Sequence, residues 1–365
     1  MSGRIAWWQP ELGDEERERV LAVLRSNYIN DGDVTEQFAQ AIAKLTGAKF
    51  GIGVTNGTSA IYLSLMALGV SHGDEVIVPD ITFIATANAV SMTGATPVLA
   101  DVDAKTLNLS VKAMEVAITS KTKAVVPVHV SGRAGGIEKI VDVARNRGLA
   151  VVEDAAEAFC SRFNKRCLGT FGHTGCFSFS PNKIITTGQG GVIVTNDEGI
   201  FHRLRELKDQ GRPVRGTGGA DVHDSVGFNF KLTNLQSAVG LGQLEKLGER
   251  MERIRRTYSI YRDELAGTKG IRILPFNIDA GEQPQWADAL AERRDQLDEF
   301  LAENGAGCRR FWFPLHTQKP YLRDEKDFPN STRVGKRAIW LPSAFQMTDD
   351  DVRSVCRLIT KFYNQ

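Results

Sequence analysis

Apolar runs alternate with helical patterns from Phe50 onward, and this alternation limits the folds open to the chain. The strand candidates are Phe50–Val54, Glu75–Pro79, Thr96–Ala100, Lys123–Val128 and Ala150–Glu153. The helical patterns between them include Ile84–Met92, Val111–Ile118 and Ile137–Arg147. Buried strands separated by helices are typical of a mainly parallel sheet with helices on both faces. We therefore expect an α/β fold.

One lysine lies between two further strand candidates. In GCFSFSPNKIITTGQGGVIVTN, Lys183 stands between the apolar runs Gly175–Phe179 and Gly191–Thr195. Burying an unpaired ammonium is costly, so such a lysine is typically deprotonated or covalently bound. A deprotonated lysine is a nucleophile that forms a Schiff base with an aldehyde. Taken alone, the segment fits a surface lysine beside a glycine-rich hairpin equally well.

An acidic residue follows the strand candidate that ends at Glu153. Ligands of open α/β sheets lie beyond the carboxyl ends of the strands, which is where Asp154 is expected. A carboxylate there can keep a ring nitrogen protonated, as the electron sink of pyridoxal phosphate (PLP) requires. A plain helix N-cap explains the same aspartate, and the two roles can coexist.

A possible phosphate cup follows the first strand candidate. The residues Asn56-Gly57-Thr58-Ser59 stand between that strand and a helical pattern. Free backbone N–H groups at a helix start, together with glycine and hydroxyl groups, form an anion site. Capping by Thr58 or Ser59 explains the same residues. The cup, the acid and the lysine together are more specific than any one of them.

Composition excludes several classes of function. The 365 residues contain 45 basic and 44 acidic side chains, so nothing in the charge balance indicates nucleic acid or an anionic membrane as a partner. No apolar run is long enough to span a bilayer, and the N-terminus lacks the apolar core of a signal peptide. The five cysteines have no metal-ligand spacing, so we expect no metal site and a reducing, cytoplasmic location.

The ordered motifs resemble one known family. They are Asn56–Ala60, Gly73–Pro79, Thr82-Phe83, Glu153–Glu157, SFSPNKIITTGQGG, Gly227–Asn234 and Pro314–His316. Together they are similar to the DegT/DnrJ/EryC1/StrS family of PLP-dependent sugar aminotransferases, with the lysine motif closest to the GDP-perosamine synthase branch. The resemblance implies the type I aspartate-aminotransferase fold, in which a large domain carries a mainly parallel seven-stranded sheet. We place that domain at residues 1–245 and a smaller C-terminal α/β domain at 246–365.

The resemblance also implies site roles. Lys183 would hold PLP and move the proton, and Asp154 would pair with the pyridinium nitrogen. Phosphate contacts would come from Gly57, Thr58 and Ser178. Phe83 would stack on the pyridine ring of the cofactor, and ordinary packing in the apolar core is the alternative role for this side chain. Asn229 would reach the phosphate across a homodimer interface. Glu157 and Gln189 depart from common family residues. A charged Glu157 would repel the cofactor phenolate, so it is protonated, turned away or bridged by a donor.

Contacts with the substrate are the least constrained expectation. The resemblance places the turn that contains Asn30 at the sugar pocket, although a plain connector between two helices is the stronger interpretation of any one residue there. His316 and His129 are further candidates, and a structural role explains each of them at least as well. Arg212 and Arg215 lie in a glycine-rich loop and are more simply solvated than bound to phosphate.

The implied reaction transfers an amine from L-glutamate to a nucleotide-linked keto sugar. The resemblance favours a GDP-linked 4-keto-6-deoxy hexose, and sugars on UDP or dTDP remain open. Two alternatives compete with this interpretation. One is a PLP-dependent dehydratase or lyase acting on a similar sugar, and the other is a non-catalytic regulatory protein with this fold.

Overall fold

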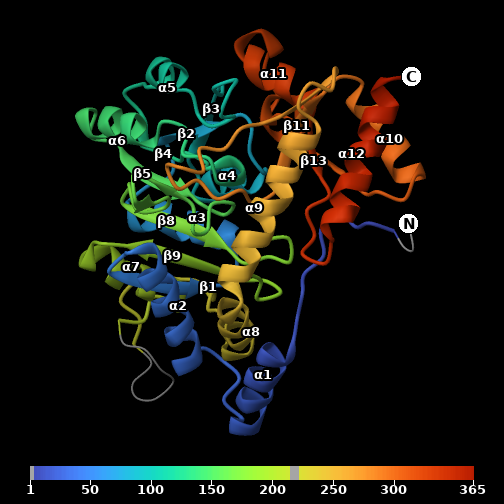
Figure 1. The fold of residues 1–365 in the computed structure, drawn as a ribbon. Coiled ribbons are helices and arrows are strands. Elements are labelled where there is room, and N and C mark those ends of the chain that lie inside the picture. Colours follow the sequence, from blue (N-terminus) through green and yellow to red (C-terminus); the bar gives the residue numbers. More distant parts are fainter. Residues whose placement is uncertain (1–3, 214–221) are drawn as a thin grey trace.

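A computed structural model describes residues 4–213 and 222–365, and Figure 1 shows its ribbon. The chain builds two sheets. A seven-stranded sheet and its helices form one side of the molecule, and a four-stranded sheet lies beside the C-terminal helices. The N-terminal segment runs from helix α1 (Asp14–Ser26) across to the C-terminal helices.

The seven-stranded sheet has the order β1-β9-β8-β5-β4-β2-β3. Its strands are β1 (Phe50–Val54), β2 (Glu75–Pro79), β3 (Thr96–Ala100), β4 (Thr122–Val125), β5 (Ala150–Asp154), β8 (Thr174–Ser178) and β9 (Gly191–Thr195). Only β9 runs antiparallel to its neighbours, because a hairpin links it to β8. The expected mainly parallel sheet is confirmed. The carboxyl ends of β5 and β8 therefore lie side by side, and both ends carry candidate site residues.

Helices cover both faces of this sheet (Figure 1). They are α2 (Asp33–Thr46), α3 (Gly57–Ala67), α4 (Ala85–Met92), α5 (Val111–Ala117), α6 (Ile137–Asn146), α7 (Glu198–Lys208) and α8 (Asn234–Glu245). The apolar face of α3 lies on the sheet, where Ile61, Leu63 and Leu65 are buried with the strand residues Ile52, Val78 and Val152. A small antiparallel hairpin, β6 (Arg162–Phe163) and β7 (Arg166–Cys167), projects after β5.

The four-stranded sheet is wholly antiparallel, in the order β10-β11-β13-β12. Its strands are β10 (Ile271–Ile273), β11 (Ala287–Ala291), β12 (Arg309–Arg310) and β13 (Ala338–Leu341). The helices around it are α9 (Leu247–Glu264), α10 (Arg294–Glu303), α11 (Pro329–Gly335) and α12 (Asp349–Tyr363), with short 3-10 turns at Val130–Gly132, Leu315–Thr317, Lys319–Tyr321 and Glu325–Asp327. A second apolar core forms between this sheet, α9 and α12.

Some predicted boundaries differ from the structure, since the strand expected at Lys123–Val128 is observed at Thr122–Val125. The helical stretch that contains α8 and α9 is broken at Lys246, which separates the two helices. Hydrophobic periodicity continues through a short break, so the sequence does not reveal it. The domain boundary placed at 245/246 falls at this break, and the division into two domains stays a prediction. The last helix, α12, is capped by Thr348, whose side chain accepts a hydrogen bond from the Asp351 amide.

The N-terminal arm, residues 5–8, crosses from α1 to the four-stranded sheet. The amide of Ile5 donates to Gly305 O at 2.8 Å, and the amide of Gly307 donates back to Ile5 O at 2.8 Å. Farther along, the Ser343 amide donates to Trp7 O at 2.9 Å. The indole of Trp8 donates to Pro181 O at 2.9 Å. The arm therefore connects the four-stranded sheet with the segment that carries Lys183.

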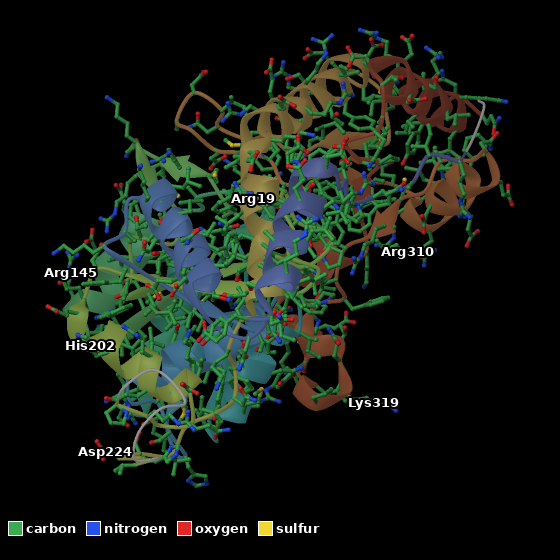
Figure 2. All side chains as sticks on the ribbon, turned by 90° about the horizontal axis from the view of Figure 1, so that it is seen from below. Arg19, Arg145, His202, Asp224, Arg310 and Lys319 are labelled. Carbon is green, nitrogen blue, oxygen red and sulfur yellow. The ribbon has the colours of Figure 1, made fainter. Side chains whose placement is uncertain are left out.

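Charged side chains lie on several parts of the surface (Figure 2). Figure 2 shows Arg145, Arg310 and Lys319 at separate places on the periphery. No helix within residues 4–213 and 222–365 combines the length and apolarity needed to cross a membrane. The same described residues contain no group of histidine, cysteine and acidic side chains that would hold a metal ion.

Candidate active site

A cavity of about 460 Å³ lies where the carboxyl ends of β5 and β8 face the four-stranded sheet. Several residues of the predicted site line it: Gly57, Thr58, Phe83, Asp154, Glu157, Ser178 and Lys183. Gln189 also lines this cavity, and its carbonyl accepts a hydrogen bond from Gln236 Nε2 at 2.7 Å. Segments far apart in the chain thus meet in one pocket.

The start of α3 forms a backbone cup at this pocket. Asn56 is the N-cap, and its Oδ1 accepts a hydrogen bond from the Ser59 amide at 2.9 Å. The amides of Gly57 and Thr58 belong to the first turn, whose N–H groups have no acceptor within the helix. A Cβ atom on Gly57 would lie 3.0 Å from the Ser178 Cβ, so glycine keeps the helix start close to the end of β8. This arrangement suits an anion such as a phosphate.

Asp154 ends β5 and is almost fully buried. Its Oδ2 accepts a hydrogen bond from Thr86 Oγ1 at 2.8 Å, and its Oδ1 accepts one from the Ala156 amide at 3.2 Å. Burial raises the pKa of this carboxyl above its ordinary value, and the Thr86 hydrogen bond partly opposes that rise. A protonated ring nitrogen is a partner that would stabilise the charged carboxylate at this depth.

Lys183 follows β8 in a tight turn and is not a solvated surface lysine. Its side chain is 10% exposed, and its Nζ lies 3.3 Å from Glu157 Oε1. The same Nζ lies 5.1 Å from the centre of the Trp286 ring, within the range of a cation–π contact. The amine is therefore buried at the cavity wall with one carboxylate and one aromatic partner.

Glu157 is held between two donors. Its Oε2 accepts a hydrogen bond from the Ser131 amide at 3.1 Å, and its Oε1 faces the Lys183 amine. Burial raises the pKa of Glu157, while the charge of Lys183 acts in the opposite direction. Glu157 is therefore not turned away from the cavity. That it is protonated or bridged to a cofactor phenolate stays a prediction.

The donor set of the cavity fits PLP. The cup at Gly57 suits the phosphate, Asp154 suits the ring nitrogen, and the amine of Lys183 suits the aldehyde. Phe83 lines the same cavity with 53% of its surface exposed, so one aromatic side chain is available to a planar ring. No group on the cavity wall conflicts with this assignment, since the one extra acid, Glu157, already has two donors.

Three predicted site residues do not line the cavity. Asn30 is exposed, and its carbonyl accepts a hydrogen bond from the Asn234 amide at 2.9 Å. Asn229 is also exposed, and Arg215 falls in the segment 214–221, which lies outside the described residues. His316 is buried, with Nδ1 2.6 Å from Asp80 Oδ2 and its ring stacked on Phe328 at 4.9 Å.

His129 has a structural environment as well. Its Nε2 lies 2.8 Å from Glu153 Oε2, and its Nδ1 lies 3.3 Å from Arg133 O. Glu153 in turn accepts hydrogen bonds from the amides of Gly169 and Gly172. Both ring nitrogens of His129 therefore have protein partners, and its ring is not on the cavity wall.

One wall of the cavity is not predicted by any motif in the sequence. It consists of residues from the four-stranded sheet and its connections: Trp286, Arg309, Trp312 and Trp340. No motif marks them, because they meet only when β11, β12 and β13 pair. The tryptophans of Phe311-Trp312 and Ile339-Trp340 are the only feature of the local sequence that could have indicated this wall.

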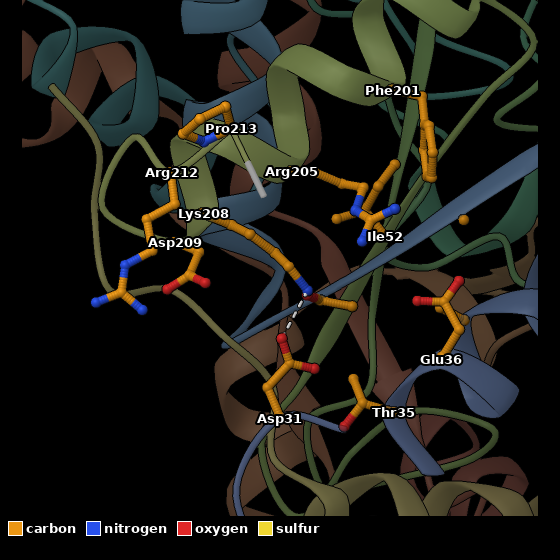
Figure 3. A pocket seen from close by; sticks show the side chains of 13 residues that line it. Asp31, Thr35, Glu36, Ile52, Phe201, Arg205, Lys208, Asp209, Arg212 and Pro213 are labelled. Atoms are coloured by element: carbon orange, nitrogen blue, oxygen red, sulfur yellow. Dashed lines mark hydrogen bonds and ion pairs between the residues drawn. The ribbon is translucent and has the colours of Figure 1, made fainter. Parts of the chain in front are cut away.

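A second, much smaller cavity of about 30 Å³ lies between β1, α2 and α7. Figure 3 shows its ion pair, in which Lys208 Nζ lies 3.2 Å from Asp31 Oδ2. Arg212 lines this cavity and not the one that contains Lys183. The space is too small for a substrate.

A buried lysine, a strand-end acid and a phosphate cup on a sheet of this topology define a PLP-dependent transaminase of fold type I. Comparisons with known proteins agree with that class. The model of the DegT/DnrJ/EryC1/StrS aminotransferase family matches residues 10–360, and the chain belongs to this family.

The similar proteins cover the whole chain. The GDP-perosamine synthase of Escherichia coli O157:H7 is 37% identical over 99% of both chains, and that of Caulobacter vibrioides is 36% identical over 96% of both. Among solved structures, DesV of S. venezuelae superposes with a TM-score of 0.94 at 29% identity over 100% of both chains. The aminotransferase TlmJ of Streptoalloteichus hindustanus gives 0.92 at 30% identity over 98% of both.

Proposed function

We propose that this aminotransferase passes the amino group of L-glutamate to a nucleotide-linked keto sugar. The leading acceptor is a GDP-linked 4-keto-6-deoxy hexose, aminated at C4. The observation that carries the proposal is the Lys183 amine, buried in the same cavity as Asp154. Two GDP-perosamine synthases, each more than a third identical over nearly the full length, support the choice of acceptor.

The residues of the cavity have separate roles in the reaction. PLP, when bound, supplies the electron sink for a carbanion at the substrate carbon. The amine of Lys183 holds the cofactor at rest and, once free, takes and returns the proton at the reacting carbon. Asp154 keeps the ring nitrogen protonated, and the first turn of α3 holds the phosphate with backbone amides. Lysine at position 183 favours amine transfer over dehydration.

Glu157 gives the released amine a partner. With Oε1 3.3 Å from Nζ, it orients Lys183 toward the cavity. Its second oxygen is fixed by the Ser131 amide, so the carboxylate cannot rotate freely. Trp286 closes the other side of the amine and keeps water away from it.

We further propose a homodimer in which Asn229 completes the phosphate site of the partner subunit. Two facts support this. Asn229 is exposed, and it is not among the described residues that line the cavity of its own chain. A cytoplasmic location is part of the same proposal, because all five cysteines are free thiols, as is usual in a reducing compartment.

The test is a panel of GDP-, UDP- and dTDP-linked keto sugars, each incubated with the holoenzyme and ¹⁵N-labelled L-glutamate. Mass spectrometry then reports incorporation of the label into the sugar. The expected result is a labelled amino sugar from the GDP-linked 4-keto substrate. A deoxygenated sugar without label identifies a lyase instead, and no product from any member of the panel rejects the substrate class.

A further inference from the structure

Arg309 differs from its neighbour in the chain by having no acidic partner. Arg310 forms ion pairs with Asp295 at 3.3 Å and Asp298 at 2.8 Å. Within residues 4–213 and 222–365, no carboxylate lies within ion-pair distance of Arg309. Successive residues of a strand point to opposite faces, so the two guanidinium groups have different surroundings.

Arg309 instead faces two indole rings. Its guanidinium carbon lies 4.9 Å from the centre of the Trp7 ring and 5.6 Å from that of Trp340. Trp340 is directly opposite Arg309 in the pairing of β12 with β13. Stacking on aromatic faces leaves the N–H groups of an arginine available for a planar, bidentate contact with an anion.

The indole platform is continuous with the wall behind Lys183. Trp7 lies 5.6 Å from Trp286 and 6.0 Å from Trp340, and the latter two rings are 4.9 Å apart. Trp286 is the ring next to the Lys183 amine. Arg309 and Lys183 are the only cationic side chains among the described residues that line this cavity. Since Lys183 is committed to the aldehyde, Arg309 alone remains for a negatively charged substrate group.

We propose that Arg309, held over Trp7 and Trp340, binds the anionic group of a substrate, either a carboxylate or a phosphate. Trp7 is its positioning residue, so the N-terminal arm forms part of the substrate site. This inference rests on the proposed function, whose donor carries carboxylates and whose acceptor carries a diphosphate. Both groups match a guanidinium fork.

The position of Trp7 is set by the backbone of the arm. Hydrogen bonds on both sides of it fix the chain, through Ile5 to Gly305 and through Trp7 O to the Ser343 amide. The indole Nε1 of Trp7 is buried and has no hydrogen-bond partner in the described structure. The ring therefore acts through its face, and its removal would leave Arg309 with one stacking partner in place of two.

The test measures binding by calorimetry on the PLP-loaded protein, with glutarate as the dicarboxylate probe and GDP as the diphosphate probe. Arg309→Met is expected to weaken one of them about 10- to 100-fold, the range for a lost charge-assisted hydrogen bond. Arg310→Met is the matched control and should change both affinities less than about twofold, since Arg310 does not line the cavity and is paired with Asp295 and Asp298. Circular dichroism confirms that each variant is folded.

The two probes identify the source of the anion. Weaker glutarate binding assigns Arg309 to the donor carboxylate, and weaker GDP binding assigns it to the acceptor diphosphate. Unchanged affinity for both probes in Arg309→Met overturns the inference, as does a wild-type protein that binds neither. If the wild-type protein binds a probe through Arg309 but aminates no sugar, the proposed function fails and the anion site stands.

The positioning role has its own readout. Trp7→Leu should weaken the same probe as Arg309→Met and raise the KM of the corresponding substrate with little change in kcat. Trp7→Phe retains an aromatic face and should restore most of the affinity. If Trp7→Leu and Trp7→Phe behave alike, the ring is not what positions Arg309.

Discussion

Arg133 and Asp288 form an ion pair of 2.5 Å in which both side chains are almost fully buried. Arg133 follows the 3-10 turn after β4, and Asp288 lies in β11, so the pair joins the two sheets. The guanidinium also donates to Pro275 O at 3.1 Å and stacks 3.9 Å from the centre of the Phe276 ring. The cavity that contains Lys183 lies between the elements that this pair connects.

Removing one member of that pair should destabilise the protein strongly. Arg133→Met leaves a buried carboxylate without its cation, at a cost of about 3–5 kcal/mol. Urea unfolding of the variant and the wild type measures the difference. The double variant Arg133→Met/Asp288→Leu should recover much of the loss, because no unpaired charge remains. A double variant as unstable as the single one would show that packing, and not charge, dominates at this position.

Lys183 should be the attachment point of the cofactor. Borohydride treatment of the PLP-loaded protein should fix the cofactor on the peptide that contains Lys183, as read by mass spectrometry. Lys183→Ala should show no such modification and should lose at least about a hundredfold in activity, since the proton carrier is gone. Labelling of another lysine in the wild-type protein would refute the assignment.

Asp154 should shape the pH dependence of stability in the cofactor-free protein. Burial raises its pKa above the ordinary 3.8, so the folded state holds this proton more tightly than the unfolded state. Its contribution to stability is full below pH 3.8 and is lost as the pH rises through the raised value. Asp154→Asn cannot titrate, so its stability should fall less over that rise.

The measurement is the free energy of unfolding from urea titrations at a series of pH values. Asp80, Glu157 and Asp288 also have pKa values raised by burial, and they are present in both proteins. The charge of Asp154 contributes to the raised pKa of Glu157, so the difference between the two curves reports Asp154 together with its effect on Glu157. Parallel curves for Asp154→Asn and the wild type would contradict the prediction that Asp154 titrates with a raised pKa in the folded protein.

Subunit mixing should reveal whether Asn229 acts across an interface. Lys183→Ala and Asn229→Ala homodimers should each be nearly inactive. A heterodimer of the two variants would carry both defects in one site and none in the other, so it should recover roughly half of the wild-type activity, as expected for two equivalent sites. Co-expression with two affinity tags isolates the heterodimer. No recovery would mean that Asn229 serves the site of its own chain.

Much of the fold was predictable because the buried strands are short, continuous apolar runs. Phe50–Val54, Glu75–Pro79 and Thr96–Ala100 have the same limits in the sequence prediction and in the structure. The site residues near strand ends, such as Asp154, could be expected from topology alone. Each of these inferences depends on the pattern of residues within one element, and that pattern can be read from a single sequence.

The sequence does not reveal which residues from distant segments contact one another. His316 is paired with Asp80, 236 positions earlier in the chain, and nothing in Pro314-Leu315-His316 reveals that carboxylate. The wall made by Trp286, Arg309 and Trp340 exists only because three strands pair. Periodicity describes one element at a time and carries no information on which elements meet.

The path of the N-terminal arm has a consequence for the order in which the protein is completed on the ribosome. Ile5 and Trp7 are synthesised long before their hydrogen-bond partners Gly305, Gly307 and Ser343. The arm must therefore remain undocked until those later segments have left the ribosome. A segment that is made early is therefore ordered late, after the residues around Gly305 and Ser343 are available to it.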